Sequence, residues 1–108
     1  MSGQITERDV EKALTQAVKR RGGVAYKFTS PGLSGVPDRL ILLPHRPAAF
    51  IEVKAPGQKP RPLQQHRIRQ IQNLGHKVFV LDHPSQIEGT LDEIQASRLP
   101  NPGHTLHP

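Results

Sequence analysis

The stretch GVPDRLILLPHRPAAFIEVKA, residues 35–55, contains two apolar segments, DRLILL and AAFIEVKA, which PHRP separates. Short apolar runs between segments that contain Pro are typical of strands, so we expect two neighbouring strands in a hairpin. The second segment carries Glu52 and Lys54 one residue apart. Because side chains alternate along a strand, these two charged side chains point to one face, while Ile51 and Val53 point to the other.

An acid and a base on one face of a strand have two interpretations. On an edge strand with one face in water, they form an exposed ion pair that contributes little to stability, and an E-x-K triplet alone is common by chance. Asp38 favours a second interpretation, because it begins the preceding strand directly after Pro37, which restricts the backbone. The hairpin then brings the Asp38 and Glu52 carboxylates together at one end of a sheet.

Two neighbouring carboxylates repel each other unless one is protonated or a cation lies between them. A hard divalent ion such as Mg²⁺ allows both to ionise. A lysine beside them, here Lys54, can orient or help deprotonate a metal-bound water and offset charge on a phosphate oxygen, as metal-assisted phosphodiester hydrolysis requires. The chain has no cysteine, which excludes thiolate ligands and thiol nucleophiles, and its six histidines show no repeated ligand spacing. We interpret the histidines as surface residues.

The rest of the chain predicts helices and strands around this hairpin. Helical apolar spacing marks residues 6–23, with Thr6 as N-cap, and residues 63–75; strands are expected at 24–30 and 77–82. A weaker third helix is expected to begin with a capping box of Ser85 and Glu88 and to be interrupted by Gly89. The order predicts an α/β fold: a mixed sheet flanked by helices, with three antiparallel strands and a parallel fourth.

Composition limits the class of protein. With 108 residues, 34% of them hydrophobic, the chain suits one domain, expected over residues 1–97, followed by a disordered tail over 98–108. No apolar run suggests a signal peptide or a membrane span, so we expect an intracellular protein. A net charge of +6 attracts polyanions such as nucleic acid, although a basic surface that only keeps the chain soluble is an equal alternative.

Three segments together resemble a known family: GVPD, then E-V-K with its Glu fourteen residues after the Asp, then PLQQHRIRQIQNLGHKVFVL. They are similar to the VRR-NUC domain, a branch of the PD-(D/E)XK nuclease superfamily, from about Glu7 to Asp82. The resemblance implies a restriction-endonuclease-like αβββαβ core and a Mg²⁺ or Mn²⁺ cofactor. It implies that Asp38, Glu52 and the Val53 carbonyl are metal ligands, and that Lys54 is the catalytic lysine.

The same resemblance implies two supporting residues. Gln64 lies eleven residues before Gly75, as the family's glutamine does, and Gln65 is the second choice; from the sequence alone, a solvated helix residue is the simpler interpretation. A glutamate of the first helix fits Glu7 best, with Glu11 in reserve, although both can be ordinary first-turn acids. One departure is Arg61, which stands in a loop where the family often has Ser.

The sequence and the resemblance together predict a Mg²⁺- or Mn²⁺-dependent DNA endonuclease of phage or bacterial type. We expect a homodimer that cuts branched DNA such as Holliday junctions, or duplex DNA, in the cytoplasm of the cell or of the phage's host. The alternatives are a non-catalytic nucleic-acid-binding module on the same fold and a basic protein–protein adaptor. Seven cationic residues are candidates for phosphate contacts: Lys19, Arg20, Arg21, Lys59, Arg61, Arg67 and Arg69.

Overall fold

The computed structural model describes residues 3–98, which fold around one four-stranded sheet in the order β1-β2-β3-β4. β1 (Val24–Lys27), β2 (Arg39–Leu42) and β3 (Ala49–Val53) pair antiparallel. β4 (Lys77–Leu81) pairs parallel with β3, because a helix connects these two strands. The mixed sheet predicted from the hairpin and the helical crossover is confirmed.

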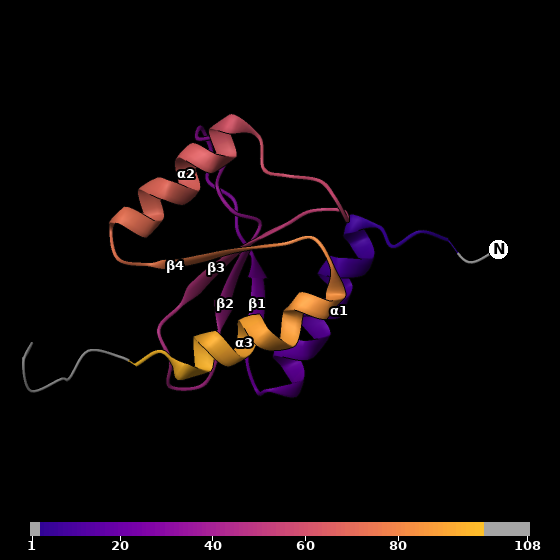
Figure 1. Cartoon of the computed structure of the whole chain (residues 1–108). Helices are drawn as coiled ribbons and strands as arrows, with labels where there is room; N and C mark the ends of the chain where they lie inside the picture. Colours follow the sequence, from indigo (N-terminus) through magenta and orange to yellow (C-terminus); the bar gives the residue numbers. More distant parts are fainter. Residues whose placement is uncertain (1–2, 99–108) are drawn as a thin grey trace, which may run out of the picture.

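Helices cover both faces of this sheet (Figure 1). α1 (Glu7–Arg20) and α3 (Ile87–Ala96) contact each other on one face, whereas α2 (Pro62–Asn73), the crossover helix, contacts β4 from the other. A short 3₁₀ helix, η1 (Pro84–Gln86), leads into α3. The α/β architecture expected from the sequence is therefore confirmed.

The hydrophobic core lies between the sheet and the α1–α3 layer. The apolar stripe predicted for α1 is buried there, and it packs against the strand residues Ile41 and Ile51 and the α3 residues Leu91 and Ile94. Thr6 caps α1 as predicted: its hydroxyl accepts from the Asp9 N–H, and the Asp9 carboxylate accepts from the Thr6 N–H. This core fixes the positions of β2 and β3.

β3 is an interior strand, buried on both faces. Ile51 and Val53 belong to the core, and on the other face the Glu52 side chain is only 1% exposed. The alternative of an edge strand with a water-exposed face is therefore wrong, because β2 and β4 flank β3 on its two sides. An acid at this position is desolvated and needs partners.

The predicted start of the third helix is wrong in two respects. Ser85 and Glu88 form no capping box: the His83 ring accepts from the Ser85 N–H, and the Glu88 carboxylate instead binds Arg21 at 2.6 Å. Pro84 begins a 3₁₀ turn before the α-helix, so Ser85 lies inside a helical turn and not at its cap. Gly89 does not interrupt α3, which runs unbroken through it.

The remaining predictions on organisation concern the ends of the chain and membranes. Residues 99–108, most of the predicted tail, lie outside the described residues, and the domain boundary at residue 97 stays a prediction. Between residues 3 and 98, none of the helices has both the length and the apolar character that a membrane crossing requires.

Candidate functional site

Asp38 is positioned at the start of β2 by the loop that precedes it. Pro37 is buried, and the Asp38 carbonyl accepts from the Phe28 N–H at 2.7 Å, which fixes the backbone at this end of the sheet. The Asp38 Oδ2 atom accepts from the Val53 N–H at 3.0 Å. One carboxylate is thus tied to the strand that carries the second, as the hairpin predicts.

The Glu52 carboxylate is buried and has two partners on its Oε2 atom. Lys54 Nζ lies 3.2 Å from Oε2, and Gln64 Nε2 donates to the same oxygen at 2.8 Å. The other oxygen, Oε1, is inaccessible to solvent and has no hydrogen-bond partner within residues 3–98. A buried carboxylate oxygen without a partner is costly, and a cation is one group that satisfies it.

The electrostatics of Glu52 depend on the same arrangement. Burial raises the pKa of Glu52 above its usual value, and the negative charge of Asp38 raises it further. The hydrogen bond from Lys54 opposes this shift and does not cancel it. Without a cation, the pair of carboxylates therefore favours a proton on Glu52, whereas a bound divalent cation would favour two ionised carboxylates.

Gln64 reaches the site because it lies in the first turn of α2, which covers the face of the sheet that carries Glu52. Its Oε1 atom accepts from the Arg61 N–H at 2.8 Å while its Nε2 atom donates to Glu52. Gln65 points elsewhere and donates to the Pro60 carbonyl. The structure thus brings Gln64 to the carboxylates, as the resemblance implies, and does not bring Gln65 there.

The two candidate acids of α1 have different surroundings. Glu11 forms a partly buried ion pair with Arg39, with Oε2 3.2 Å from the Arg39 Nη2 atom. Glu7 lies exposed in the first turn of α1, and no hydrogen bond or ion pair of its carboxylate is found within the described residues. The partner of Glu11, Arg39, also donates to the Ala25 carbonyl and was not identified from the sequence. The one sequence feature that could have drawn attention to Arg39 is its place directly after Asp38.

The seven candidate DNA-binding residues fall into two groups. Lys59, Arg61, Arg67 and Arg69 lie in the loop after β3 and on α2, on the Glu52 side of the sheet. Lys19, Arg20 and Arg21 lie at the C-terminal end of α1, which leads into the start of β1, opposite to Asp38. Arg21 also binds two acids of α3, Glu88 and Asp92. The structure does not bring this second group to the site.

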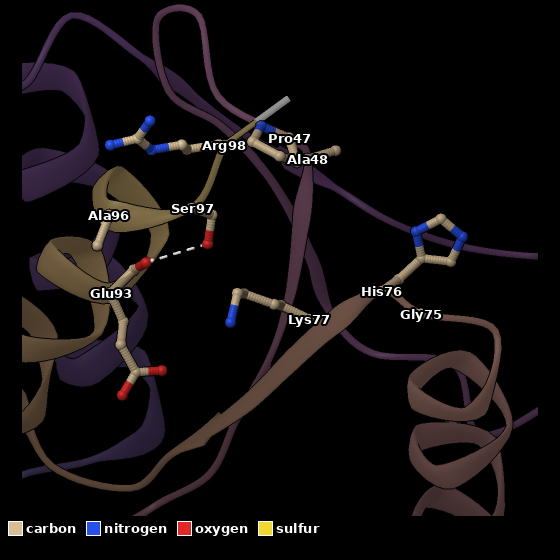
Figure 2. A pocket seen from close by; sticks show the side chains of 9 residues that line it. All are labelled: Pro47, Ala48, Gly75, His76, Lys77, Glu93, Ala96, Ser97 and Arg98. Atoms are coloured by element: carbon tan, nitrogen blue, oxygen red, sulfur yellow. Dashed lines mark hydrogen bonds between the residues drawn. The ribbon is translucent and has the colours of Figure 1, made fainter. Parts of the chain in front are cut away.

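A separate hollow of about 450 Å³ opens at the other end of the sheet, where β4 begins (Figure 2). Figure 2 shows the Lys77 side chain extending into it between Glu93 and Ala48, with His76 turned away. It contains a single carboxylate, that of Glu93, and none of the residues predicted to carry chemistry. The predicted residues Asp38, Glu52 and Lys54 therefore lie outside this hollow.

The candidate metal ligands at this site are the carboxylate oxygens of Asp38 and Glu52. Across residues 3–98, no three side chains of His, Cys, Asp or Glu are grouped so that they can hold a metal ion. A metal at Asp38 and Glu52 would need a further ligand from the backbone, for which the Val53 carbonyl is the candidate, and from water. Oxygen ligands with several waters suit Mg²⁺ and Mn²⁺.

Comparisons with known proteins identify a family with this fold. Residues 4–83 match the VRR-NUC domain family. The chain is 51% identical over 78 residues to a protein described as "Putative nuclease p44" from Acyrthosiphon pisum secondary endosymbiont phage 1; the match covers 72% of this chain and 84% of that protein. A solved structure described as "VRR_NUC domain" is similar with a TM-score of 0.75 and 30% identity, over 80% of this chain and 94% of the other.

Proposed function

Because this chain belongs to the VRR-NUC family of nucleases, we propose that it is a DNA endonuclease that depends on Mg²⁺ or Mn²⁺. The observation that carries the proposal is the Glu52 carboxylate. It is buried beside a second acid and a lysine, and one of its oxygens has no partner among the described residues. A site built only for stability would place an apolar residue there at lower cost.

The residues present fit a divalent cation. Asp38 and Glu52 supply carboxylate oxygens, the unpartnered Oε1 atom of Glu52 lacks a counter-charge, and the Val53 carbonyl is the third protein ligand in the proposal. When bound, such an ion polarises a phosphate oxygen and lowers the pKa of a water molecule. The protein holds the two carboxylates in place through the Val53 N–H and Gln64.

Lys54 is the proposed catalytic residue. Its ammonium group lies 3.2 Å from Glu52 Oε2, on the same face of the strand as the carboxylate. From this place it can orient the attacking water and offset negative charge that develops on the phosphate. The water oxygen forms a bond to phosphorus, one sugar oxygen leaves and takes up a proton, and no oxidant or other co-reactant is needed.

Gln64 and Glu7 have supporting roles in the proposal. Gln64 is a positioning residue, since it is held at both ends by Arg61 and Glu52. Glu7 is the proposed first-helix acid, because the Glu11 carboxylate is already bound by Arg39. Its exposed carboxylate can assist the metal or its waters through solvent.

We assign phosphate contacts to Lys59, Arg61, Arg67 and Arg69, which lie in the loop after β3 and on α2, on the Glu52 side of the sheet. Contacts from Lys19, Arg20 and Arg21 require DNA that reaches the opposite end of the sheet, and Arg21 would have to leave Glu88. Binding by the first group predicts DNA affinity that falls steeply with salt. A protein–protein adaptor predicts no such dependence.

Branched DNA is the substrate that we favour, with a homodimer as the active form in the bacterial or host cytoplasm. One chain carries one site, so cutting both strands of a junction or duplex needs two chains. The sheet supplies an apolar area on the face that α1 and α3 leave open: Tyr26 is 58% exposed and Val24 42% exposed, opposite half-buried Leu40 and Leu42 on β2. We propose that a second copy covers it.

Incubation with labelled four-way junction, flap and plain duplex DNA tests the proposal. The nuclease predicts cleavage with Mg²⁺ or Mn²⁺ and none with a chelator, with the junction cut faster than the duplex. DNA binding without cleavage in either ion would favour the non-catalytic module. Light scattering at several concentrations tests the dimer, and Tyr26→Glu should dissociate it if the open face of β1 and β2 is the interface.

A further inference from the structure

The loop between β1 and β2 presents an exposed leucine on a fixed backbone. Ser30, Pro31, Gly32 and Leu33 form a turn in which the Leu33 N–H donates to the Ser30 carbonyl at 3.0 Å. Pro31 and Gly32, whose φ is +76°, occupy the two central positions that a type II turn favours. Leu33 is nevertheless 42% exposed, although burial is the favoured state of a leucine side chain.

The same loop is held against the N-terminal end of α2, beside which it lies in Figure 1. Arg67 Nε donates to the Ser34 carbonyl at 3.0 Å. Gly35 has a φ of +87°, and a Cβ atom there would lie 3.0 Å from Leu63 Cγ, so the loop backbone rests directly on Leu63. Leu63 itself remains 46% exposed. Two exposed leucines therefore belong to one braced unit of loop and helix.

Both segments of this unit, the loop and the start of α2, lead directly into residues of the carboxylate site. The loop runs through Pro37 into Asp38, and Leu63 directly precedes Gln64, which donates to Glu52. A substrate phosphate at the carboxylates would bring the adjoining nucleotides beside Leu33 and Leu63. Apolar side chains gain nothing from phosphates or sugars in water, whereas they stabilise the exposed face of an unstacked base.

We propose that Leu33 and Leu63 form a wedge that packs against the base pair exposed where a DNA duplex branches. The inference rests on the nuclease proposal and specifies how its substrate is selected. In a continuous duplex both faces of every base pair are covered by stacking, so the wedge has to unstack a step at a cost of a few kcal/mol. At a branch point, one face of the base pair is more readily available to the two leucines. The chain has no Trp and four other aromatic residues, so aliphatic residues replace an aromatic stacking platform here.

Two measurements test the wedge, and Leu74→Ala is the matched control, because Leu74 is 73% exposed at the other end of α2. The first is the ratio of cleavage rates on a four-way junction and on a duplex of the same sequence. We expect Leu33→Ala and Leu63→Ala each to lower this ratio about tenfold, a loss typical of one stacked contact, and Leu74→Ala to leave it unchanged. An unchanged ratio in both variants, or an equal fall in the control, overturns the proposal.

The second measurement does not require cleavage. A junction with 2-aminopurine at its branch point is titrated with the Lys54→Ala chain, with and without Leu33→Ala. The wedge predicts a change in fluorescence on binding that Leu33→Ala abolishes and Leu74→Ala retains. The same fluorescence in all three chains overturns the wedge. If the wild-type chain cuts no DNA but still gives a fluorescence change that Leu33→Ala abolishes, the nuclease proposal is overturned and the wedge proposal is retained.

Discussion

Gln64 Nε2 donates a 2.8 Å hydrogen bond to Glu52 Oε2, and through it the first turn of α2 fixes a buried carboxylate of β3. The other end of the Gln64 side chain accepts from the Arg61 N–H. One side chain thus satisfies the start of a helix and orients a proposed metal ligand. Residues that orient metal ligands typically matter nearly as much as the ligands themselves.

Gln64→Ala is therefore expected to lower the cleavage rate about 10- to 100-fold, the usual cost of removing a group that orients a metal ligand. Gln65→Ala is the matched control, since Gln65 donates only to the Pro60 carbonyl. The rate should recover with added Mg²⁺ if the loss lies in metal affinity. Equal rates for the two variants would show that Gln64 serves only the helix start.

Glu52 makes the stability of the metal-free chain depend on pH. Burial and the Asp38 charge raise the pKa of Glu52 in the folded state, so the folded chain binds a proton more tightly than the unfolded chain does. Stability should therefore fall as pH rises from the usual glutamate pKa through the raised value. Thermal unfolding in chelator over pH 4 to 9, the range that brackets ordinary and raised carboxyl pKa values, measures this.

Glu52→Gln removes the titrating group, so the variant should lack this fall and unfold at a higher temperature than the wild type at neutral pH in chelator. It should also lose cleavage. Glu93→Gln, at an exposed position of α3, is the control and should retain the wild-type pH profile. A wild-type chain whose stability rises over the same pH range would contradict this electrostatic description of the site.

Divalent metal should offset the loss of stability that the metal-free chain shows as pH rises. Mg²⁺ or Mn²⁺ that binds only the folded chain adds about 2.7 kcal/mol to the free energy of unfolding at 100 times the dissociation constant, by mass action, and so raises the unfolding temperature. Asp38→Asn removes one proposed ligand and should abolish most of this gain. Asp92→Asn, at an exposed α3 residue that binds Arg21, should retain it. Equal metal stabilisation of both variants would place the ion elsewhere.

Substitution of the two candidate acids of α1, Glu11 and Glu7, should have different effects on stability and cleavage. Glu11→Gln leaves the partly buried Arg39 guanidinium without its ion pair and should lower the free energy of unfolding by about 1–3 kcal/mol. Glu7→Gln, at an exposed position, should leave unfolding unchanged and lower the cleavage rate. Chemical denaturation and cleavage assays on both variants measure the two effects. A destabilised Glu7→Gln chain with wild-type cleavage would exclude Glu7 from the site.

The sequence predicted the helix and strand order well, because the apolar periodicity of α1 reflects its burial directly and β3 is a short apolar run that follows a Pro-containing segment. It also predicted that Asp38 and Glu52 meet, since a hairpin requires it. The burial of Glu52, on the second face of β3, was not predictable, because it depends on where α2 packs. The proposed role of Gln64 came from family resemblance, since a first-turn glutamine has no pattern of its own.

Long-range polar pairs account for further differences. Arg21 looked available for phosphates, but its partner Glu88 lies 67 residues further along the chain, and no local pattern relates the two. The same pair explains why Glu88 does not complete a capping box with Ser85. The Arg39–Glu11 pair, 28 residues apart, was missed for the same reason.

The central claim is that the carboxylates and Lys54 form a hydrolytic site. Its most direct test is the cleavage of labelled four-way junction DNA with Mg²⁺ by the wild-type chain, Lys54→Ala and the control Lys12→Ala, which alters an exposed lysine of α1. We predict cleavage by the wild type and Lys12→Ala that stops in chelator, and a loss of at least about 100-fold in Lys54→Ala with DNA binding retained. Equal cleavage by Lys54→Ala, or cleavage that persists in chelator, would contradict the account.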